Sequence, residues 1–239
     1  MNAPASNSRA RIAVIVPVLN EAAQIGGLLD DLRRHDFAER IVVDGGSDDG
    51  TAEIAQSSGA TLLRTARGRG AQLNAGAAAA RSEILLFLHA DTRLPDASCD
   101  RIRAVLGDAT VVAGCFRLSF DMTHPMLSLY AKASAFDSVF TTFGDQAYFV
   151  RGPVFREIGG FPEWPFLEDV ELRRRLKRRG RFVKSDARVV TSARRFRSGG
   201  IVRQQLKNSL VLCAFLAGVP AVRLAKWYAP QRTGERKPR

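Results

Sequence analysis

Three apolar runs in the first 91 residues each end in a polar segment that contains a carboxylate. The runs cover residues 11–16, 41–43 and 84–88, and the polar segments after them cover residues 17–21, 44–51 and 89–91. Because side chains beyond the carboxyl ends of parallel strands converge on one crevice, we expect these segments to form one binding site. Carboxylates in such a crevice indicate a ligand that brings a metal-bound phosphate.

Helical patterns separate the predicted strands. Apolar side chains recur at helical spacing in residues 21–34, and further helices are expected at residues 51–57 and in the alanine-rich stretch after a short strand at residues 61–64. This alternation predicts an α/β fold, a three-layer sandwich whose mainly parallel central sheet carries helices on both faces.

The second half of the chain is less regular. Strands are expected at residues 111–120 and 143–151, a helix containing Tyr130 and Phe136 between them, and another helix at residues 168–179 after a loop rich in glycine and proline.

These patterns predict one main domain at residues 11–200. It divides into a nucleotide-binding half at residues 11–110 and an acceptor half at residues 111–200. A disordered tail (residues 1–10) precedes it, and a C-terminal helical segment with a basic tail (residues 201–239) follows it.

Composition narrows the function only in part. With 239 residues, 46% of them hydrophobic, the chain can bury a full core. Its formal charge of +12 predicts attraction to polyanions, which include nucleotide phosphates, nucleic acids and anionic membranes. Three cysteines without metal-ligand spacing favour a reducing compartment. The polar first ten residues do not read as a secretory signal, so we expect a cytoplasmic protein.

Two familiar nucleotide-binding loops do not occur at the first strand. A dinucleotide-binding turn needs glycines after that strand, where this chain has residues 17–21, and a P-loop needs glycine, lysine and serine or threonine at fixed spacing. Gly68 and Gly70 follow the third strand and lack the lysine.

The order of the polar motifs resembles that of family 2 glycosyltransferases with the GT-A fold. The motifs are residues 17–21, residues 44–51, Asn74 with Gly76, residues 89–91, and Glu168 with Asp169. The resemblance covers residues 11–200 and implies inverting transfer of a sugar from a nucleotide-diphosphate donor, most often a UDP-sugar, to a hydroxyl acceptor. Residues 144–146, 161–169 and 192–195 are similar to a bacterial branch described as arsenosugar-biosynthesis or selenodomain-associated transferases.

For the donor, the resemblance implies contacts of the nucleoside with Pro17, Val18, Asn20 and Glu21. Asp44 would accept hydrogen bonds from the base or the ribose, since a carboxylate has only acceptors. Ser47 and Asp48 either support this loop or cap the helix at residues 51–57.

For the diphosphate, the resemblance makes Asp91 the ligand of a divalent cation, Mg²⁺ or Mn²⁺. His89 and Ala90 stand where the family has an acidic residue and its neighbour, and His89 either ligates the cation or hydrogen-bonds the donor. The other residues expected at the donor are Arg67, Arg69, Gln72, Asn74, Arg194 and Arg195, of which the arginines suit the diphosphate.

For the acceptor, the resemblance makes Asp169 the general base that removes the hydroxyl proton. Glu168 would orient the loop or the acceptor, and Asp145 is expected on the acceptor side. Acids at a helix N-terminus are also ordinary partners of the helix dipole.

The C-terminal segment combines an apolar helical pattern with basic residues. This is typical of a peripheral membrane contact, which would suit a lipid-linked acceptor and a place on the inner face of the cell membrane. A packing helix or a dimer surface explains the same pattern, and the sequence does not fix the oligomeric state.

Two other functions remain open. A nucleotidyltransferase on a similar fold would use metal and nucleotide but release pyrophosphate. A basic module that binds nucleic acid or membrane without catalysis would bind with a steep salt dependence. No known nucleic-acid-binding motif occurs, so no specific nucleic acid partner is expected.

Overall fold

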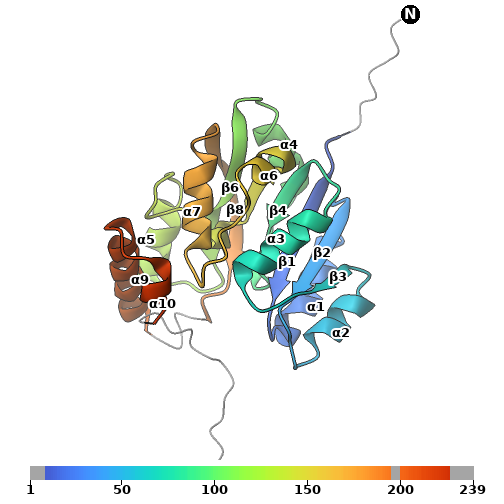
Figure 1. The fold of residues 1–239 in the computed structure, drawn as a ribbon, viewed down its shortest axis with the longest axis horizontal. Helices are drawn as coiled ribbons and strands as arrows, with labels where there is room; N and C mark the ends of the chain where they lie inside the picture. The colour runs from blue at the N-terminus through green and yellow to red at the C-terminus, as the bar shows by residue number, and fades with distance from the viewer. Residues whose placement is uncertain (1–8, 195–199, 227–239) are drawn as a thin grey trace, which may run out of the picture.

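One sheet of eight strands runs through the part of the chain that the computed structural model describes, residues 9–194 and 200–226 (Figure 1). Along the chain its strands are β1 (Ile12–Val18), β2 (Glu39–Asp44), β3 (Thr61–Arg64), β4 (Ile84–Phe87), β5 (Thr92–Arg93), β6 (Val111–Phe120), β7 (Tyr148–Arg151) and β8 (Arg181–Thr191). Their order in the sheet is β3-β2-β1-β4-β7-β6-β8-β5.

The first four strands in this order are parallel. β1 pairs with β2 and β4, and β2 pairs with β3. The register places Val18 beside Asp44 and Asp44 beside Arg64, so the carboxyl ends of these strands meet at one edge. The rest of the sheet is mixed, because β7 runs antiparallel to β4 and β6 whereas β8 runs parallel to β6.

Helices cover both faces of the sheet (Figure 1). They are α1 (Ala22–Leu32), α2 (Thr51–Ser57), α3 (Arg69–Ala79), α4 (Ser98–Val105), α5 (Pro125–Ala133), α6 (Gly152–Glu157), α7 (Glu168–Leu176), α9 (Ile201–Leu216) and α10 (Ala221–Ala225), with a 3-10 turn η1 (Gly144–Gln146) before β7. Buried side chains of α1 and α4 pack on one face, and those of α3, α6 and α7 pack on the other.

β1 shows why the apolar runs form central strands. Ile12, Val14 and Val16 belong to the core on one face, while Ala13 and Ile15 belong to the core on the other. Successive side chains of a strand point to opposite faces, so a strand covered by helices on both sides must be apolar throughout.

Helix α3 approaches the sheet closely at Gly76. A Cβ atom at this position would lie 2.4 Å from Ile15 Cγ2. We therefore expect Gly76→Ala to lower the free energy of unfolding by about 1–3 kcal/mol, as overpacking of a dense core does. The matched control is Gly26→Ala in α1, where the nearest atom, Ile54 Cγ2, is 3.5 Å away. There the helix preference of alanine, worth about 1 kcal/mol, should stabilise the protein. Urea denaturation tests the pair, and equal stabilisation by both changes would contradict the close approach.

The predicted α/β fold is confirmed, and several boundaries differ from the expected ones. The expected strand at residues 143–151 begins as η1, the helix after residue 125 ends at Ala133 and leaves Phe136 outside, and α7 ends at Leu176. The sequence patterns did not indicate α4, α6, β5 or β8. The predicted domain boundaries stay predictions, and residues 1–8 and 227–239 lie outside the described residues.

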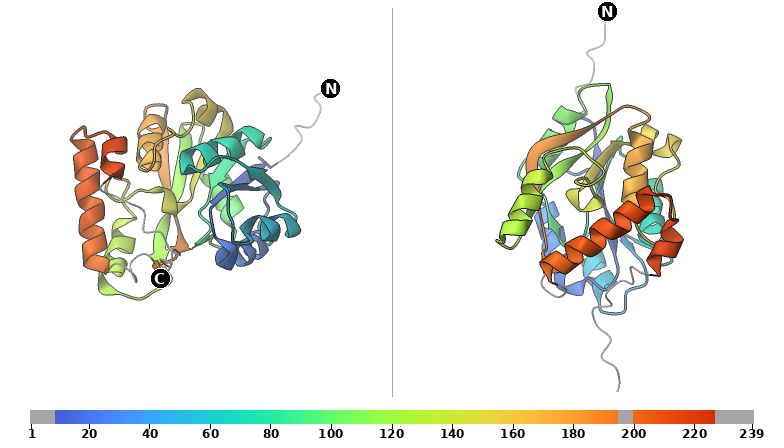
Figure 2. Two further views of the ribbon diagram at one scale, coloured as in Figure 1. Left: turned by 60° about the horizontal axis from the view of Figure 1, so that its bottom comes forward. Right: turned by 90° about the vertical axis from the view of Figure 1, so that its left-hand side faces the viewer.

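Helix α9 lies at the edge of the molecule (Figure 2). It contacts the loop before α7 through Phe215, whose ring centroid is 5.8 Å from that of Trp164. None of the described helices is both long and apolar enough to cross a membrane.

Candidate active site

The predicted site segments lie at the carboxyl ends of β1, β2 and β4, where α3 and α7 begin. A small cavity there is lined by Arg69, His89, Gly144, Glu168 and Asp169, together with aromatic and aliphatic side chains. A larger hollow lies at the amino-terminal ends of β1 and β4 and contains none of the predicted site residues. The charged groups therefore gather at the edge of the sheet that the sequence predicts.

Asp44 is buried at the end of β2 and organises the loop after it. Its carboxylate accepts hydrogen bonds from the backbone amide and the hydroxyl of Ser47. Ser47 Oγ in turn accepts from the Asn20 amide at 2.9 Å, and Asn20 Oδ1 accepts from the Asp48 amide at 3.0 Å. The loops after β1 and β2 are thus held together by their own polar side chains.

The expected N-cap role of Ser47 or Asp48 is wrong. Helix α2 begins after Gly50, which has a φ of 89°, and Asp49 instead accepts hydrogen bonds from the Thr51 amide and hydroxyl. Burial disfavours ionisation of Asp49, but these bonds outweigh burial and lower its pKa. Ser47 instead supports Asp44, because its hydroxyl donates to the Asp44 carboxylate and accepts from the Asn20 amide in the loop after β1.

Gln72 and Asn74 hold backbone segments around the site. Gln72 Nε2 donates to the carbonyls of Val18 and Val43 at 2.9 and 2.8 Å, so the buried side chain joins the ends of β1 and β2. Asn74 forms two hydrogen bonds with the backbone of Phe161, both at 2.9 Å. These hydrogen bonds fix the backbone segments around the expected nucleotide position. Direct contact of Gln72 or Asn74 with a nucleotide stays a prediction.

Arg69, the first residue of α3, connects the predicted nucleotide-binding half to the predicted acceptor half. Its guanidinium lies 3.4 Å from the Glu168 carboxylate, and the two side chains are 41% and 2% exposed. Burial raises the pKa of Glu168, and Arg69 opposes that shift. Burial also disfavours the charged form of Arg69, but Glu168, Asp169 and Asp91 outweigh it and raise its pKa. The ion pair of Arg69 and Glu168 therefore joins the start of α3 to the start of α7.

Asp169 lies in the first turn of α7 with its carboxylate held on both oxygens. Oδ2 accepts from the Gly144 amide at 2.6 Å, and Oδ1 accepts from the Val170 amide at 2.9 Å. Gly144 begins η1, which also carries Asp145. Backbone donors therefore orient the carboxylate beside the cavity.

Left-handed backbone conformations occur next to these loops. Asn20, Ala147 and Leu167 have φ values of 55°, 53° and 62°. Residues other than glycine rarely adopt this conformation, which costs of order 1–3 kcal/mol and gathers at functional sites. Leu167 directly precedes Glu168 and sets the direction in which α7 begins.

His89, Ala90 and Asp91 follow β4. His89 lines the cavity, Ala90 is buried, and the Asp91 carbonyl accepts from the Ser192 amide at 3.1 Å. Among the described residues, no group of three or more His, Cys, Asp or Glu side chains forms a ready metal cage. A single carboxylate such as Asp91 is nevertheless compatible with Mg²⁺ or Mn²⁺, because these ions take most of their ligands from substrate phosphates and water.

The remaining predicted residues lie around this centre. Arg194 Nη2 is 3.5 Å from Glu21 Oε1, which places the end of β8 beside the loop after β1. Arg67 is exposed in the loop before α3. Pro17 and Val18 end β1. Arg195 lies outside the described residues.

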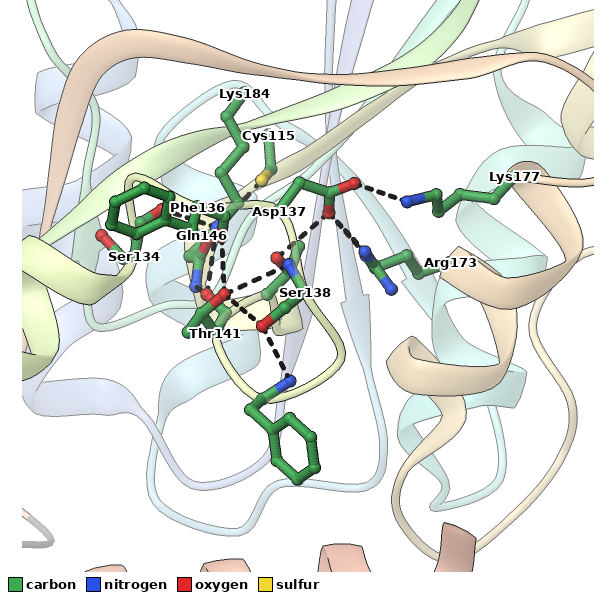
Figure 3. A network of polar contacts seen from close by, with 12 residues as sticks. Cys115, Ser134, Phe136, Asp137, Ser138, Thr141, Gln146, Arg173, Lys177 and Lys184 are labelled. Carbon is green, nitrogen blue, oxygen red and sulfur yellow. Dashed lines mark hydrogen bonds and ion pairs between the residues drawn. The ribbon is translucent and has the colours of Figure 1, made fainter.

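A polar network that the sequence did not reveal holds η1 in place (Figure 3). Lys184 Nζ donates to the carbonyls of Ser134 and Thr141 and, at 2.8 Å, to Gln146 Oε1. Burial lowers the pKa of Lys184. Because Lys184 is on β8 and Gln146 ends η1, this network fixes the turn that donates to Asp169.

The loop between α5 and η1, which contains Asp137, is attached to α7. Asp137 accepts from Arg173 Nε at 2.9 Å and from Lys177 Nζ at 2.8 Å (Figure 3). The signal in the sequence for this network is a charged residue, Lys184, at an inward position of a strand. It could not be used because β8 was not predicted.

Asp137→Asn should destabilise the protein at neutral pH and much less in acid. Burial disfavours the Asp137 carboxylate, but hydrogen bonds from Lys177 and Arg173 outweigh burial and lower its pKa. Its contribution is therefore full above the ordinary carboxyl pKa of about 4 and is lost as pH falls through the lower folded value. We expect a cost of about 1.5–3 kcal/mol at pH 7, measured by urea denaturation at several pH values.

The control is Asp186→Asn, which removes a surface ion pair with Arg101. Such pairs contribute about 0–1 kcal/mol. If Asp137→Asn lowers the free energy of unfolding equally at neutral and acid pH, the charge of Asp137 does not stabilise the fold.

Comparisons with known proteins agree with this geometry. Residues 13–156 match the family described as Glycosyl transferase family 2. Glycosyltransferase AglJ of Haloferax volcanii is 38% identical over 60 residues, which are 25% of this chain and 20% of that protein. The matched segment thus spans a fifth of this relative's length.

Solved structures show the same fold. The mannosyltransferase PcManGT from Pyrobaculum calidifontis, in complex with GDP-Man and Mn²⁺, has a TM-score of 0.70 and 24% identity over 94% of this chain and 69% of its own. TarS of S. aureus in complex with UDP-GlcNAc has a TM-score of 0.61 and 20% identity over 76% of this chain and 58% of its own. The match to the family covers more than half of the sequence, and the chain belongs to glycosyl transferase family 2.

Proposed function

We propose that this chain transfers a sugar from a nucleoside-diphosphate donor to a hydroxyl group, with inversion at the anomeric carbon. The observation that carries the proposal is the position of Arg69, whose guanidinium lies 3.4 Å from the Glu168 carboxylate and lines one cavity with His89 and Asp169. Residues for a diphosphate and residues for an acceptor thus meet at one cavity.

The donor would lie over the loops after β1 and β2. Asp44 uses part of its acceptor capacity for Ser47, and a carboxylate has about four lone-pair sites in total. The remaining sites suit the N3–H of uracil or ribose hydroxyls, which supports a UDP-sugar. Asn20 and Glu21 border the same loops, and the Arg69 fork suits the diphosphate.

Asp91 would hold a divalent cation together with the donor phosphates. When bound, such an ion offsets the charge that develops on the leaving diphosphate. His89, two residues before Asp91, lines the cavity with Arg69 and Glu168 and would meet the donor there.

Asp169 would act as the general base. Its carboxylate takes the proton of the acceptor hydroxyl while the oxygen forms a bond to the anomeric carbon. The bond from that carbon to the diphosphate breaks, and its electron pair leaves with the nucleoside diphosphate. One displacement by one base inverts the anomeric centre. The amides of Gly144 and Val170 keep the carboxylate oriented for this step.

Finer points of the proposal rest on the sequence. We assign the chain to hexosyl transfer in the bacterial branch with arsenosugar-biosynthesis and selenodomain-associated transferases, because residues 144–146 and 161–169 are similar to it. The cytoplasm is the proposed location, since the three cysteines show no disulfide pattern.

A panel of nucleoside diphosphates and nucleotide sugars tests the proposal by thermal shift, with and without Mn²⁺. We expect UDP with Mn²⁺ to raise the melting temperature, as a ligand at a hundredfold excess over its Kd adds about 2.7 kcal/mol. Asp44→Asn should weaken the response. Product analysis must then find UDP from a UDP-sugar. Release of pyrophosphate would indicate nucleotidyl transfer, and a flat response to every nucleotide would contradict the donor site.

A further inference from the structure

Helix α9 exposes more large apolar side chains than an ordinary surface helix does. Four large apolar side chains are exposed on it: Val202, Leu206 and Leu210 are 56%, 60% and 70% exposed, and Leu216 at the end of the helix is also exposed. The first three are four residues apart and share one face. We call these four side chains the apolar stripe.

The other side of α9 is polar in its N-terminal half, and Val211 and Leu212 are buried further along the helix. Gln204, Gln205, Lys207 and Asn208 are only partly exposed, and Gln204 donates to Asn208 at 2.8 Å. A helix that packs on a protein core normally turns its apolar side inward and its polar side to water. Single exposed leucines are common, but a continuous exposed stripe marks an interaction surface.

Basic side chains accompany the stripe. Arg203, Arg223 and Lys226 are exposed, and Val222 on α10 adds another exposed apolar side chain. Residues 201–239 contain eight lysines and arginines and one acidic residue, Glu235. An apolar stripe flanked by cations complements the surface of an anionic bilayer, which has charged headgroups over an apolar interior. A second copy of the chain would bring the same cations against each other.

We propose that the apolar stripe of α9 docks on an anionic lipid bilayer, with the helix parallel to the membrane plane. The 16 residues of α9 span about 24 Å. This is shorter than the roughly 30 Å of hydrocarbon that a spanning helix crosses. The helix therefore lies in the interfacial layer.

The position of α9 in the fold leaves the stripe accessible. Both panels of Figure 2 show α9 at the edge of the molecule, with α5 near its N-terminal end. Leu129 of α5 and Phe136 and Phe140 of the following loop are also exposed. Aromatic and aliphatic side chains of this kind favour the membrane–water interface.

The test is cosedimentation of the full chain with vesicles of phosphatidylcholine alone and of equal parts phosphatidylcholine and phosphatidylglycerol. We expect binding to the mixed vesicles that weakens at high salt. The double change Leu206→Gln and Leu210→Gln should lower the partition coefficient at least about tenfold, since two exposed leucines lose their apolar contact with lipid. Val190→Gln, an exposed change on β8, is the matched control and should bind as the wild type does.

Further readouts separate the outcomes. Far-UV circular dichroism of the double variant must match the wild type, and its thermal response to UDP with Mn²⁺ should persist, so loss of docking is distinguished from loss of the donor site. Arg203→Gln with Lys226→Gln should weaken binding more than Arg178→Gln with Arg33→Gln, which removes the same charge elsewhere. Wild-type chain that stays in the supernatant with mixed vesicles would overturn the proposal. So would a dimer, seen by light scattering, that the double change converts to a monomer.

Discussion

Asp169→Asn should lower the rate of sugar transfer by about 10²–10⁴-fold while donor binding stays unchanged. The amide side chain keeps the size of the carboxylate and an oxygen that accepts from Gly144, but it cannot take a proton from the acceptor. The rate is measured as release of nucleoside diphosphate with an acceptor hydroxyl or with water. The thermal response to the donor reports binding separately.

Glu157→Gln serves as the control, because Glu157 pairs with Arg179 at the surface, away from the cavity. It should leave both readouts unchanged. A rate for Asp169→Asn within a few-fold of the wild type would exclude Asp169 as the base and turn attention to Asp145 on the adjoining turn.

Asp91→Asn should remove the dependence on the divalent cation. A neutral amide is a weak ligand for Mg²⁺ or Mn²⁺, so we expect donor turnover to fall by about 10²–10³-fold, the loss of several kcal/mol of charge stabilisation. In the thermal-shift experiment, Mn²⁺ should no longer increase the response to UDP. The variant thus changes metal-dependent binding as well as rate, which separates it from Asp169→Asn.

The matched control for this change is Asp96→Asn, an exposed carboxylate five residues further along the same segment. It should keep the full response to Mn²⁺. An Asp91→Asn protein that still binds UDP more tightly with Mn²⁺ than without it would show that the cation is held elsewhere.

The parallel half of the sheet could be predicted because its strands are buried on both faces. Runs such as residues 12–16 and 84–88 must be apolar throughout in that environment, and the polar loops then mark the strand ends. This is why the positions of Asp44 and Asp91 followed from the sequence. The common edge on which they lie is a property of parallel strands.

The mixed half could not be predicted in the same way. β8 contains Arg181, Lys184, Ser185, Asp186 and Arg188, and its register with β6 shifts twice, so no regular alternation remains in the sequence. Because β8 was not predicted, the polar network around Lys184 could not be predicted either. Similarly, Asn74 and Gln72 carry no sign in the sequence that their amides contact backbone groups rather than a ligand.

The resemblance in sequence located Glu168 and Asp169, but the physical reason for their position appears only in three dimensions. Arg69 and Glu168 are 99 residues apart in the chain. Long-range contacts of this kind depend on how two halves of a sheet pack, which local patterns do not encode.

The ring contact between Trp164 and Phe215 has a consequence for how the enzyme would reach a membrane-dissolved acceptor. Trp164 lies in the loop that leads to Glu168 and Asp169, and Phe215 lies on the helix that we place on lipid. If both proposals hold, the Asp169 carboxylate and the lipid headgroup layer would be joined by one short stretch of chain and one pair of aromatic rings. An alcohol whose tail stays dissolved among acyl chains would need only its polar end to rise toward the enzyme.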